Sequence, residues 1–239
     1  KGTGINFNVP LIQNSYIDIK ELDTSNIESK VARYLSQMYC EHQFDLLGSG
    51  WVKNSYDSVA LGVEGYKYNM NVSIQNSKFK IQNYTPIDWQ KDYKSGYRWS
   101  EMTWYKDIKF GTDLGVDIKV PWELARFQHL PQLAIFCMID ENLKEQNIKE
   151  FKHQVLDFIE NNPPRMGVNW VCTMDVGIRA ANMLVAYDMF MQIDDFGILD
   201  NQFKQTFSNS IYEHGVHIVN NLEYSEFGRN NHYLSDIVG

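Results

Sequence analysis

The chain has 239 residues, of which 44% are hydrophobic and 22% charged, a composition that excludes an intrinsically disordered protein. Its 22 Lys and Arg residues are outnumbered by 30 Asp and Glu residues, and the net charge of −8 excludes the broad basic surface of a nucleic-acid-binding protein. A polyanionic ligand therefore needs a locally basic cleft. Aromatic residues make up 14% of the chain, and such side chains fill a core or stack on sugar rings.

Cysteine spacing and hydropathy indicate which metal sites and membrane-spanning segments the sequence supports. Cys40, Cys137 and Cys172 show no Cys-x-x-Cys or Cys/His spacing, so neither a disulfide framework nor a zinc site is indicated. We therefore expect no metal and no cofactor. The longest apolar run, residues 133–139, is too short to span a bilayer, so we expect no membrane insertion.

The first half of the chain predicts one helix and then irregular structure. Residues 23–41 have helical periodicity, and Asp23, Thr24 or Ser25 can cap the helix start. Residues 44–112 are rich in Gly, Asn, Ser and aromatic residues with short alternations, which predicts a few short strands and few helices. Residues 1–116 are thus expected to form an N-terminal helix and an irregular segment that pack on the rest.

The second half predicts successive helices. Pro121 suits the first turn of a helix, whereas Pro131 lacks the amide hydrogen that a continuing helix needs, so we expect one kinked helix or two abutting helices. Asn147 is expected to cap the next helix, which Asn162 and the two prolines after it should end.

A central helix and two further helices are expected to complete the chain. Residues 170–192 are apolar nearly all round, a pattern typical of a helix covered on most sides. Another helix is expected over residues 203–218, and a last one should begin near Asn231. Long helices with short connections predict a mainly α fold of antiparallel helical hairpins over residues 117–239.

Two Arg-carboxylate pairs are expected in this half. Asp175, Arg179 and Asn182 share one face of the apolar helix. We favour a buried structural pair of Asp175 with Arg179, and the alternative is that Arg179 binds a substrate carboxylate or sulfate. Glu123 and Arg126 form a second structural pair at i, i+3, and His129 is expected to be an ordinary, satisfied histidine.

The last cluster combines amides with an imidazole at a helix start. It contains Arg229, Asn230, Asn231, His232 and Tyr233. Such groups can grip and neutralise a carboxylate through charge-assisted hydrogen bonds. From spacing alone, a simple helix cap is the favoured interpretation of the run, and a site is the alternative.

Five segments, in order, carry a resemblance to a known family. They are FDLLGSGW at 44–51, YTPIDWQKDYKSGYRWSEMTWY at 84–105, DIKVPWELARFQHLPQLA at 117–134, NPPRMGVNW at 162–170 and NNHYLSDIVG at 230–239. Together they resemble the heparinase II/III polysaccharide lyases, and especially members encoded with capsule or O-antigen polysaccharide genes. The resemblance covers nearly everything after residue 40, and the shared order of the motifs is far more specific than any one of them.

The resemblance implies an incomplete (α/α) toroid followed by an antiparallel β-sandwich. Residues 117–239 would be the first part of that toroid, and the remaining toroid and the sandwich would lie downstream. A bacterial protein of the periplasm or cell envelope is favoured by the same resemblance. The expected partner is an acidic polysaccharide or oligosaccharide.

The resemblance also implies a mechanism. Such enzymes cleave uronic-acid polysaccharides by β-elimination, and an Asn followed by His neutralises the substrate carboxylate. Asn231 and His232 match that pair, so they are the expected catalytic residues. The tyrosine acid/base of the family lies downstream of the pair, and Tyr233 is not assigned that role, so we expect the chain alone to be inactive.

Further residues are expected to bind substrate. They are Asn169, Trp170, Arg179, Arg229 and Asn230. Trp99, Trp104 and Trp122 are expected to fill the core instead.

Two other functions remain open. One is a non-catalytic toroid that binds glycans of the cell surface. The other is an inverting glycoside hydrolase, which needs two carboxylates across the sugar, for which Asp175 and Glu123 are the candidates.

Overall fold

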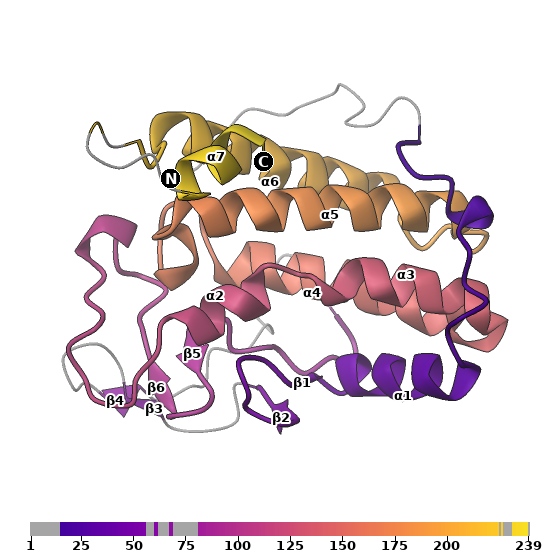
Figure 1. The fold of residues 1–239 in the computed structure, drawn as a ribbon, viewed down its shortest axis with the longest axis horizontal. Coiled ribbons are helices and arrows are strands. Elements are labelled where there is room, and N and C mark those ends of the chain that lie inside the picture. Colours follow the sequence, from indigo (N-terminus) through magenta and orange to yellow (C-terminus); the bar gives the residue numbers. More distant parts are fainter. Residues whose placement is uncertain are drawn as a thin grey trace.

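The computed structural model describes residues 15–55, 60–61, 67–68, 81–224, 226 and 231–238. Over these residues the fold is mainly α, as the sequence predicts, with small sheets at one side of the helices (Figure 1). Within the described residues, no helix combines the length and apolar character needed to cross a membrane.

The first α-helix, α1 (Ser29–Cys40), is shorter than the predicted helix over 23–41. A 3₁₀ helix, Ile19–Glu21, precedes it. The predicted caps at residues 23–25 are wrong, because Asp23 instead accepts a hydrogen bond from the Ser25 amide in a local turn. Glu28 is the residue before the helix, and its side chain makes no capping bond.

The predicted break between two proline-containing helices is confirmed. Helix α2 (Lys119–Ala125) and helix α3 (His129–Ile139) abut at Phe127, whose φ of 58° ends the first helix. Pro131 is the third residue of α3 and Pro121 the third of α2. Each proline therefore occupies a first turn, where its missing amide hydrogen costs no helical hydrogen bond.

Helix α4 (Lys144–Asn161) begins earlier than predicted and ends where predicted. The 3₁₀ helix Glu141–Leu143 runs directly into it, so Asn147 lies inside the helix and the prediction that it caps the start is wrong. Asn147 is fully buried; it accepts a 2.6 Å hydrogen bond from Ser36 Oγ and donates one of 3.0 Å to the Leu133 carbonyl. It thereby ties α4 to α1 and α3.

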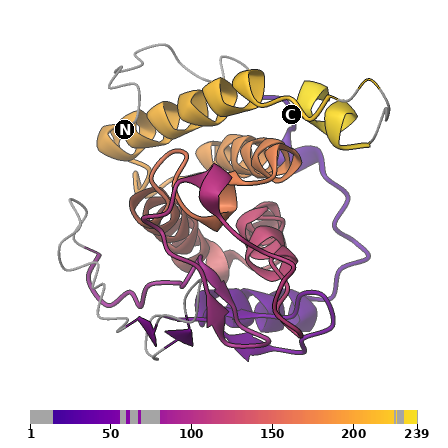
Figure 2. The ribbon, with the colours of Figure 1, turned by 90° about the vertical axis from the view of Figure 1, so that its left-hand side faces the viewer.

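The remaining helices build two rows. After the 3₁₀ helix Val168–Trp170 come α5 (Thr173–Ile193), α6 (Asn201–Asn220) and α7 (Asn231–Val238). One row runs α1, α3, α5, α7, and α4 and α6 form the second (Figure 2). Helices α3 and α4 form one hairpin and α5 and α6 the next, so the predicted central position of α5 is confirmed.

Among the residues that the structure describes, six two-residue strands lie in the N-terminal half. Strands β1 (Gln43–Phe44) and β2 (Val52–Lys53) pair antiparallel. The other strands are β3 (Ala60–Leu61), β4 (Lys67–Tyr68), β5 (Lys91–Asp92) and β6 (Tyr97–Arg98). They form a sheet of order β4-β3-β6-β5, in which only the β3–β6 pair is parallel. A further 3₁₀ helix, Tyr105–Asp107, follows.

The hydrophobic core joins this irregular half to the helices. Trp89 is fully buried and makes edge-on contacts with Phe127 and Phe158, at ring distances of 5.1 and 5.3 Å. Phe151 of α4 stacks on Phe190 of α5 at 4.7 Å. Aromatic burial of this kind stabilises a fold by a few kcal/mol per side chain. A division of the chain between residues 116 and 117 stays a prediction.

Candidate functional site

The polar residues of interest gather at one end of the helix rows. The start of α5, the end of α6 and helix α7 lie together there, on the left in Figure 1. Thr173, the first residue of α5, donates a 2.8 Å hydrogen bond to the carbonyl of Asn221, just after α6. Two polar clusters meet at this end, one buried and one open to solvent.

The buried cluster centres on Arg179, which is completely inaccessible. Its Nε donates to His214 Nε2 at 2.9 Å and its Nη2 donates to the Asn169 carbonyl at 2.9 Å. The guanidinium carbon also lies 4.7 Å from the ring centre of Phe158 and 5.4 Å from that of Trp170. Arg179 thus holds α5, α6 and the turn before α5 together.

The tautomer of His214 follows from its two partners. Its Nδ1 lies 2.7 Å from the Ser210 carbonyl, which can only accept, so Nδ1 carries the proton. Nε2 is then the acceptor that Arg179 requires. Burial, together with the positive charge of Arg179, holds the pKa of His214 well below its ordinary value. The ring is therefore neutral at physiological pH.

Asp175 and Arg179 are both inaccessible, as expected, but the predicted pairing between them is wrong. Asp175 Oδ1 instead accepts from Arg126 Nε at 2.5 Å, and Arg126 Nη1 donates to Glu123 Oε2 at 2.5 Å. Asp175 reaches α2 while Arg179, one turn later, reaches α6. Partners on neighbouring helices thus replace the intrahelical pair. The predicted Glu123–Arg126 pair is confirmed.

Burial also lowers the pKa of the Arg179 guanidinium, to about 9, although the Asp175 charge acts in the opposite direction. Arg179 therefore still carries its proton at neutral pH. His129 is likewise buried, with Nε2 2.6 Å from Gln154 Oε1, so its expected role as an ordinary satisfied histidine is confirmed.

Asn169 and Trp170 belong to the buried cluster, and both side chains are about 1% exposed. Asn169 Nδ2 donates to the Trp89 carbonyl at 2.7 Å and to Asn162 Oδ1 at 2.8 Å. Trp170 Nε1 donates to the Asn162 carbonyl at 3.3 Å. Asn162, which follows α4, is the shared partner, and sequence reasoning identified it only as a helix end.

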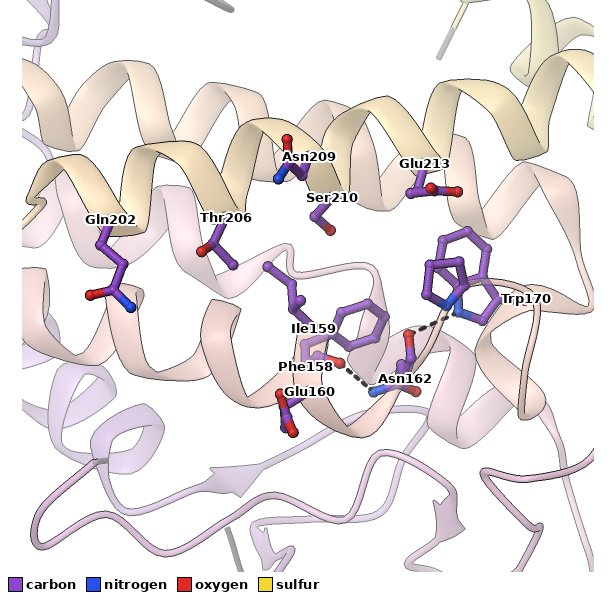
Figure 3. Close-up of a pocket in the computed structure, with 11 residues that line it drawn as sticks. Phe158, Ile159, Glu160, Asn162, Trp170, Gln202, Thr206, Asn209, Ser210 and Glu213 are labelled. Atoms are coloured by element: carbon purple, nitrogen blue, oxygen red, sulfur yellow. Dashed lines mark hydrogen bonds between the residues drawn. The ribbon is translucent and has the colours of Figure 1, made fainter. Parts of the chain in front are cut away.

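A hollow of about 410 Å³ borders Trp170 and Asn162 between α4 and α6 (Figure 3). One wall is a row of polar side chains on α6: Gln202, Thr206, Asn209, Ser210 and Glu213. The other wall carries Phe158 and Ile159 of α4. Amides and hydroxyls facing apolar groups suit a sugar, but the Trp170 ring is covered and presents almost no face to the hollow.

The open cluster centres on Glu223, in the connection between α6 and α7. Its Oε2 accepts from the Met174 amide, in the first turn of α5, at 3.1 Å. A carboxylate in this position is stabilised by the positive end of the α5 dipole. The same oxygen lies 3.3 Å from His232 Nδ1, and the two side chains are 29% and 45% exposed.

A second hollow, of about 480 Å³, opens beside Glu223. Its lining includes Tyr105, Lys106, Phe110, Val171 and Asn221. Phe110 is 47% exposed. The hollow therefore combines an accessible aromatic ring, one cation and several polar groups within reach of the open cluster.

The predicted catalytic pair lies at the start of α7. Asn231 is its first residue and is exposed, while His232 points toward Glu223. Arg229 and Asn230 lie outside the described residues. The structure brings Asn169, Trp170 and Arg179 together in the buried cluster and leaves His232 in the open one. Glu223, which orients His232, carried no motif by which the sequence could single it out.

Comparison with protein families gives a match over residues 3–239 to the heparinase II/III N-terminus family. The chain belongs to this family. Comparisons with curated proteins and with solved structures yield no match. Membership supports a role related to polysaccharide lyases, with a polysaccharide as substrate.

In this heparinase II/III chain, one group of side chains has the chemistry to hold a metal ion. Within the described residues, Cys172, Glu223 and His232 bring one ligand atom each to within 4.8 Å of the others. The three come from the turn before α5, the α6–α7 connection and α7.

Proposed function

We propose that this chain is the N-terminal part of a lyase that cleaves uronic-acid-containing polysaccharide by β-elimination. In that reaction this chain binds the substrate, and Asn231 and His232 neutralise the uronate carboxylate. The observation that carries the proposal is the His232–Glu223 contact at the start of α7, beside a hollow lined by Lys106 and the exposed ring of Phe110. Family membership supports the reaction class.

The chemistry explains why this end of the mechanism needs hydrogen-bond donors. A base removes the proton at C5, the electron pair forms the C4–C5 double bond, and the C4 oxygen leaves with the bond electrons. In the transition state, negative charge spreads onto the C5 carboxylate, which is already anionic. Donors aimed at that carboxylate are worth several kcal/mol because they act where charge develops.

The donors at the start of α7 have the required character. Glu223 lies against Nδ1 of His232, which leaves Nε2 as the ring nitrogen that can donate to a substrate carboxylate. The exposed amide of Asn231 adds an uncharged donor. Helix α7 directs its positive end toward the same place.

We propose a supporting role for Asn169, Trp170 and Arg179, in place of the direct substrate contact expected from the sequence. Their side chains are closed off by protein. By fixing the turn before α5, they set the position of Met174, to which Glu223 is bonded. Arg229 and Asn230 remain proposed substrate-binding residues, as neighbours of the catalytic pair.

The glycoside hydrolase alternative loses its candidates. Glu123 and Asp175 are both bonded to Arg126, which places the two carboxylates on one guanidinium. An inverting hydrolase needs its carboxyl groups about 6.5–9.5 Å apart, with sugar and water between them. Two groups sharing a cation cannot serve as an independent acid and base.

The test is an assay of the full-length parent enzyme on a panel of uronate polymers, following the ultraviolet absorbance of the new C4–C5 double bond. We expect product from at least one polymer. We expect no product from residues 1–239 alone, because the resemblance implies a base downstream of the pair. Binding of every polymer without product would favour the non-catalytic glycan-binding alternative. Product formed by the chain alone would show that the base lies within it.

A further inference from the structure

Cys172, Glu223 and His232 meet although they are far apart in the sequence. Cys172 is the residue before α5, Glu223 follows α6, and His232 is the second residue of α7. Cys172 Sγ lies 3.8 Å from Glu223 Oε2, and His232 Nδ1 lies 3.3 Å from the same oxygen. All three ligand atoms fall within 4.8 Å of one another.

The two separations that involve Glu223 Oε2 are close to the edges of a tetrahedral zinc site. Zinc lies about 2.3 Å from thiolate sulfur, about 2.0–2.1 Å from imidazole nitrogen and about 2.0–2.2 Å from carboxylate oxygen. At the tetrahedral angle, these bond lengths separate nitrogen from oxygen by about 3.3–3.5 Å and sulfur from oxygen by about 3.5–3.7 Å. The observed distances of 3.3 and 3.8 Å therefore need shifts of only a few tenths of an ångström.

We propose that Cys172, Glu223 and His232 form a zinc site with three protein ligands and a fourth position open to solvent. Thiolate, imidazole and carboxylate together are the ligand set of a borderline-soft divalent ion, and zinc accepts all three. Cys172 is buried, whereas His232 and Glu223 are partly exposed, so the open position faces outward. Water or an anion would complete the coordination.

The surrounding charges favour a cation. Asp236 Oδ2 accepts a 2.6 Å hydrogen bond from the backbone amide of Glu223, so a second carboxylate lies next to this ligand. Contacts of this kind orient a metal ligand. Two features oppose the ion: the positive end of α5, and the Met174 amide that already bonds Glu223 Oε2. A carboxylate has about four lone-pair positions, so one bond to an amide leaves room for a metal.

Zinc uptake must release protons. Burial, and then the nearby Asp175 charge, raise the pKa of the Cys172 thiol, so the thiol keeps its proton until a metal displaces it. The ion would add a covalent link between the start of α7 and the turn before α5, two elements that already pack together. This proposal does not depend on the lyase assignment, since metal binding is measured without substrate.

The experiment titrates the metal-free chain with zinc by calorimetry and, separately, with Co²⁺ while recording its absorption spectrum. We expect one zinc per chain with a Kd of about 1 μM or below. A thiolate-to-cobalt charge-transfer band should appear in the near ultraviolet, because Cys172 donates sulfur. The band needs no variant, so it reports on the site even where a substitution impairs folding.

Two variants and a matched control locate the ion. Cys172→Ser and Glu223→Gln should each weaken zinc binding by about 100-fold or more, since even indirect partners of a ligand contribute about 10–100-fold. Cys172→Ser should also abolish the cobalt band. Cys137→Ser removes another buried thiol, which donates to the Leu133 carbonyl, and should change neither reading. Circular dichroism checks that each variant is folded.

Three outcomes would overturn the proposal. The first is binding of less than one zinc per chain. The second is a cobalt spectrum without the thiolate band. The third is equal weakening by Cys137→Ser and Cys172→Ser. Under any of them the cluster is only a His–Glu ion pair with a thiol beside it.

Discussion

The Arg179 cluster and the His232 cluster are separated by a few residues of chain at the start of α5, yet their environments are opposite. Around Arg179 every side chain is inaccessible, and charged groups are matched by neutral acceptors such as His214 and the Asn169 carbonyl. In the open cluster, Glu223 and His232 are 29% and 45% exposed. The first arrangement fixes positions, and the second keeps groups available for a ligand.

In this fold, the residues that stabilise the structure are distinct from those that remain available to a ligand. A buried cation such as Arg179 is costly unless packing and hydrogen bonds offset its desolvation. Its neighbours are therefore committed to holding it. An exposed pair such as His232 and Glu223 contributes little to stability, because water screens it. Substitutions in the two clusters should consequently fail in different ways.

The largest expected effect is acid unfolding, which depends on buried histidines and leaves the exposed His232–Glu223 pair out. Burial lowers the pKa of His129 and of His217 to about 4, from an ordinary value of 6.5. Between pH 6.5 and pH 4 the unfolded chain therefore binds more protons than the folded chain, and the free energy of unfolding falls as pH falls. Each of these histidines contributes up to about 3 kcal/mol, and the neutral His214 acts in the same direction.

Asp157 opposes this trend. Burial raises its pKa to about 7, from an ordinary value of 3.8. The folded chain therefore binds the extra proton between these two values, and stability from this group increases as pH falls. Burial also raises the pKa of Asp88, which acts with Asp157. The three buried histidines outweigh these aspartates, so urea unfolding should show a net loss of several kcal/mol between pH 6.5 and pH 4. Equal free energies of unfolding at the two pH values would contradict the claim that these buried histidines stay neutral in the folded chain.

Arg179→Ala should come next, with a loss of about 4 kcal/mol in the free energy of unfolding. The reason is a cavity against Trp170 and Phe158 together with the lost bonds to His214 and Asn169. Asp175 keeps Arg126, so an uncompensated carboxylate is not the cause. Arg33→Ala is the matched control, because Arg33 is 57% exposed and its pair with Asp140 contributes at most about 1 kcal/mol. Similar losses of stability in Arg179→Ala and Arg33→Ala would show that the buried arginine does not support the fold more than the exposed one.

Asn231→Ala should affect activity and leave stability unchanged. In the full-length parent we expect kcat and kcat/KM to fall together by about 10²–10³, comparable to the loss of one oxyanion donor. KM should change little. Asn201→Ala makes the same change at the exposed start of α6 and should keep full activity. An active Asn231→Ala enzyme would remove the basis for placing chemistry at the start of α7.

Glu223→Gln should have the smallest effect on stability, a loss of about 1 kcal/mol or less in thermal unfolding. The variant keeps an oxygen for the Met174 amide and loses the charge at the start of α5. The loss should shrink at about 1 M salt, where charges are screened over about 3 Å. Glu226→Gln alters an exposed carboxylate of the same connection and is the control. A loss above about 3 kcal/mol would mean that the open cluster supports the fold as strongly as the buried one.

The helical framework could be predicted from the sequence alone, because prolines and apolar periodicity act within a few residues of the chain. The prolines after Asn162 end α4, Pro131 fits the first turn of α3, and the apolar pattern of α5 predicts its central position. These features depend on amide hydrogens and periodicity within a few residues. The family motifs, read in order, were likewise sufficient to indicate the family that the match over residues 3–239 shows.

Only the tertiary structure decided which polar groups meet. Spacing along one helix predicted a bond between Asp175 and Arg179. Instead, Asp175 is bonded to Arg126 beside α2, and Arg179 is bonded to His214 on α6. Cys172 and Glu223 are likewise close only because the α5–α6 hairpin returns the chain to its starting end. Helical periodicity fixes the face on which a side chain lies, whereas its partner depends on how the helices pack.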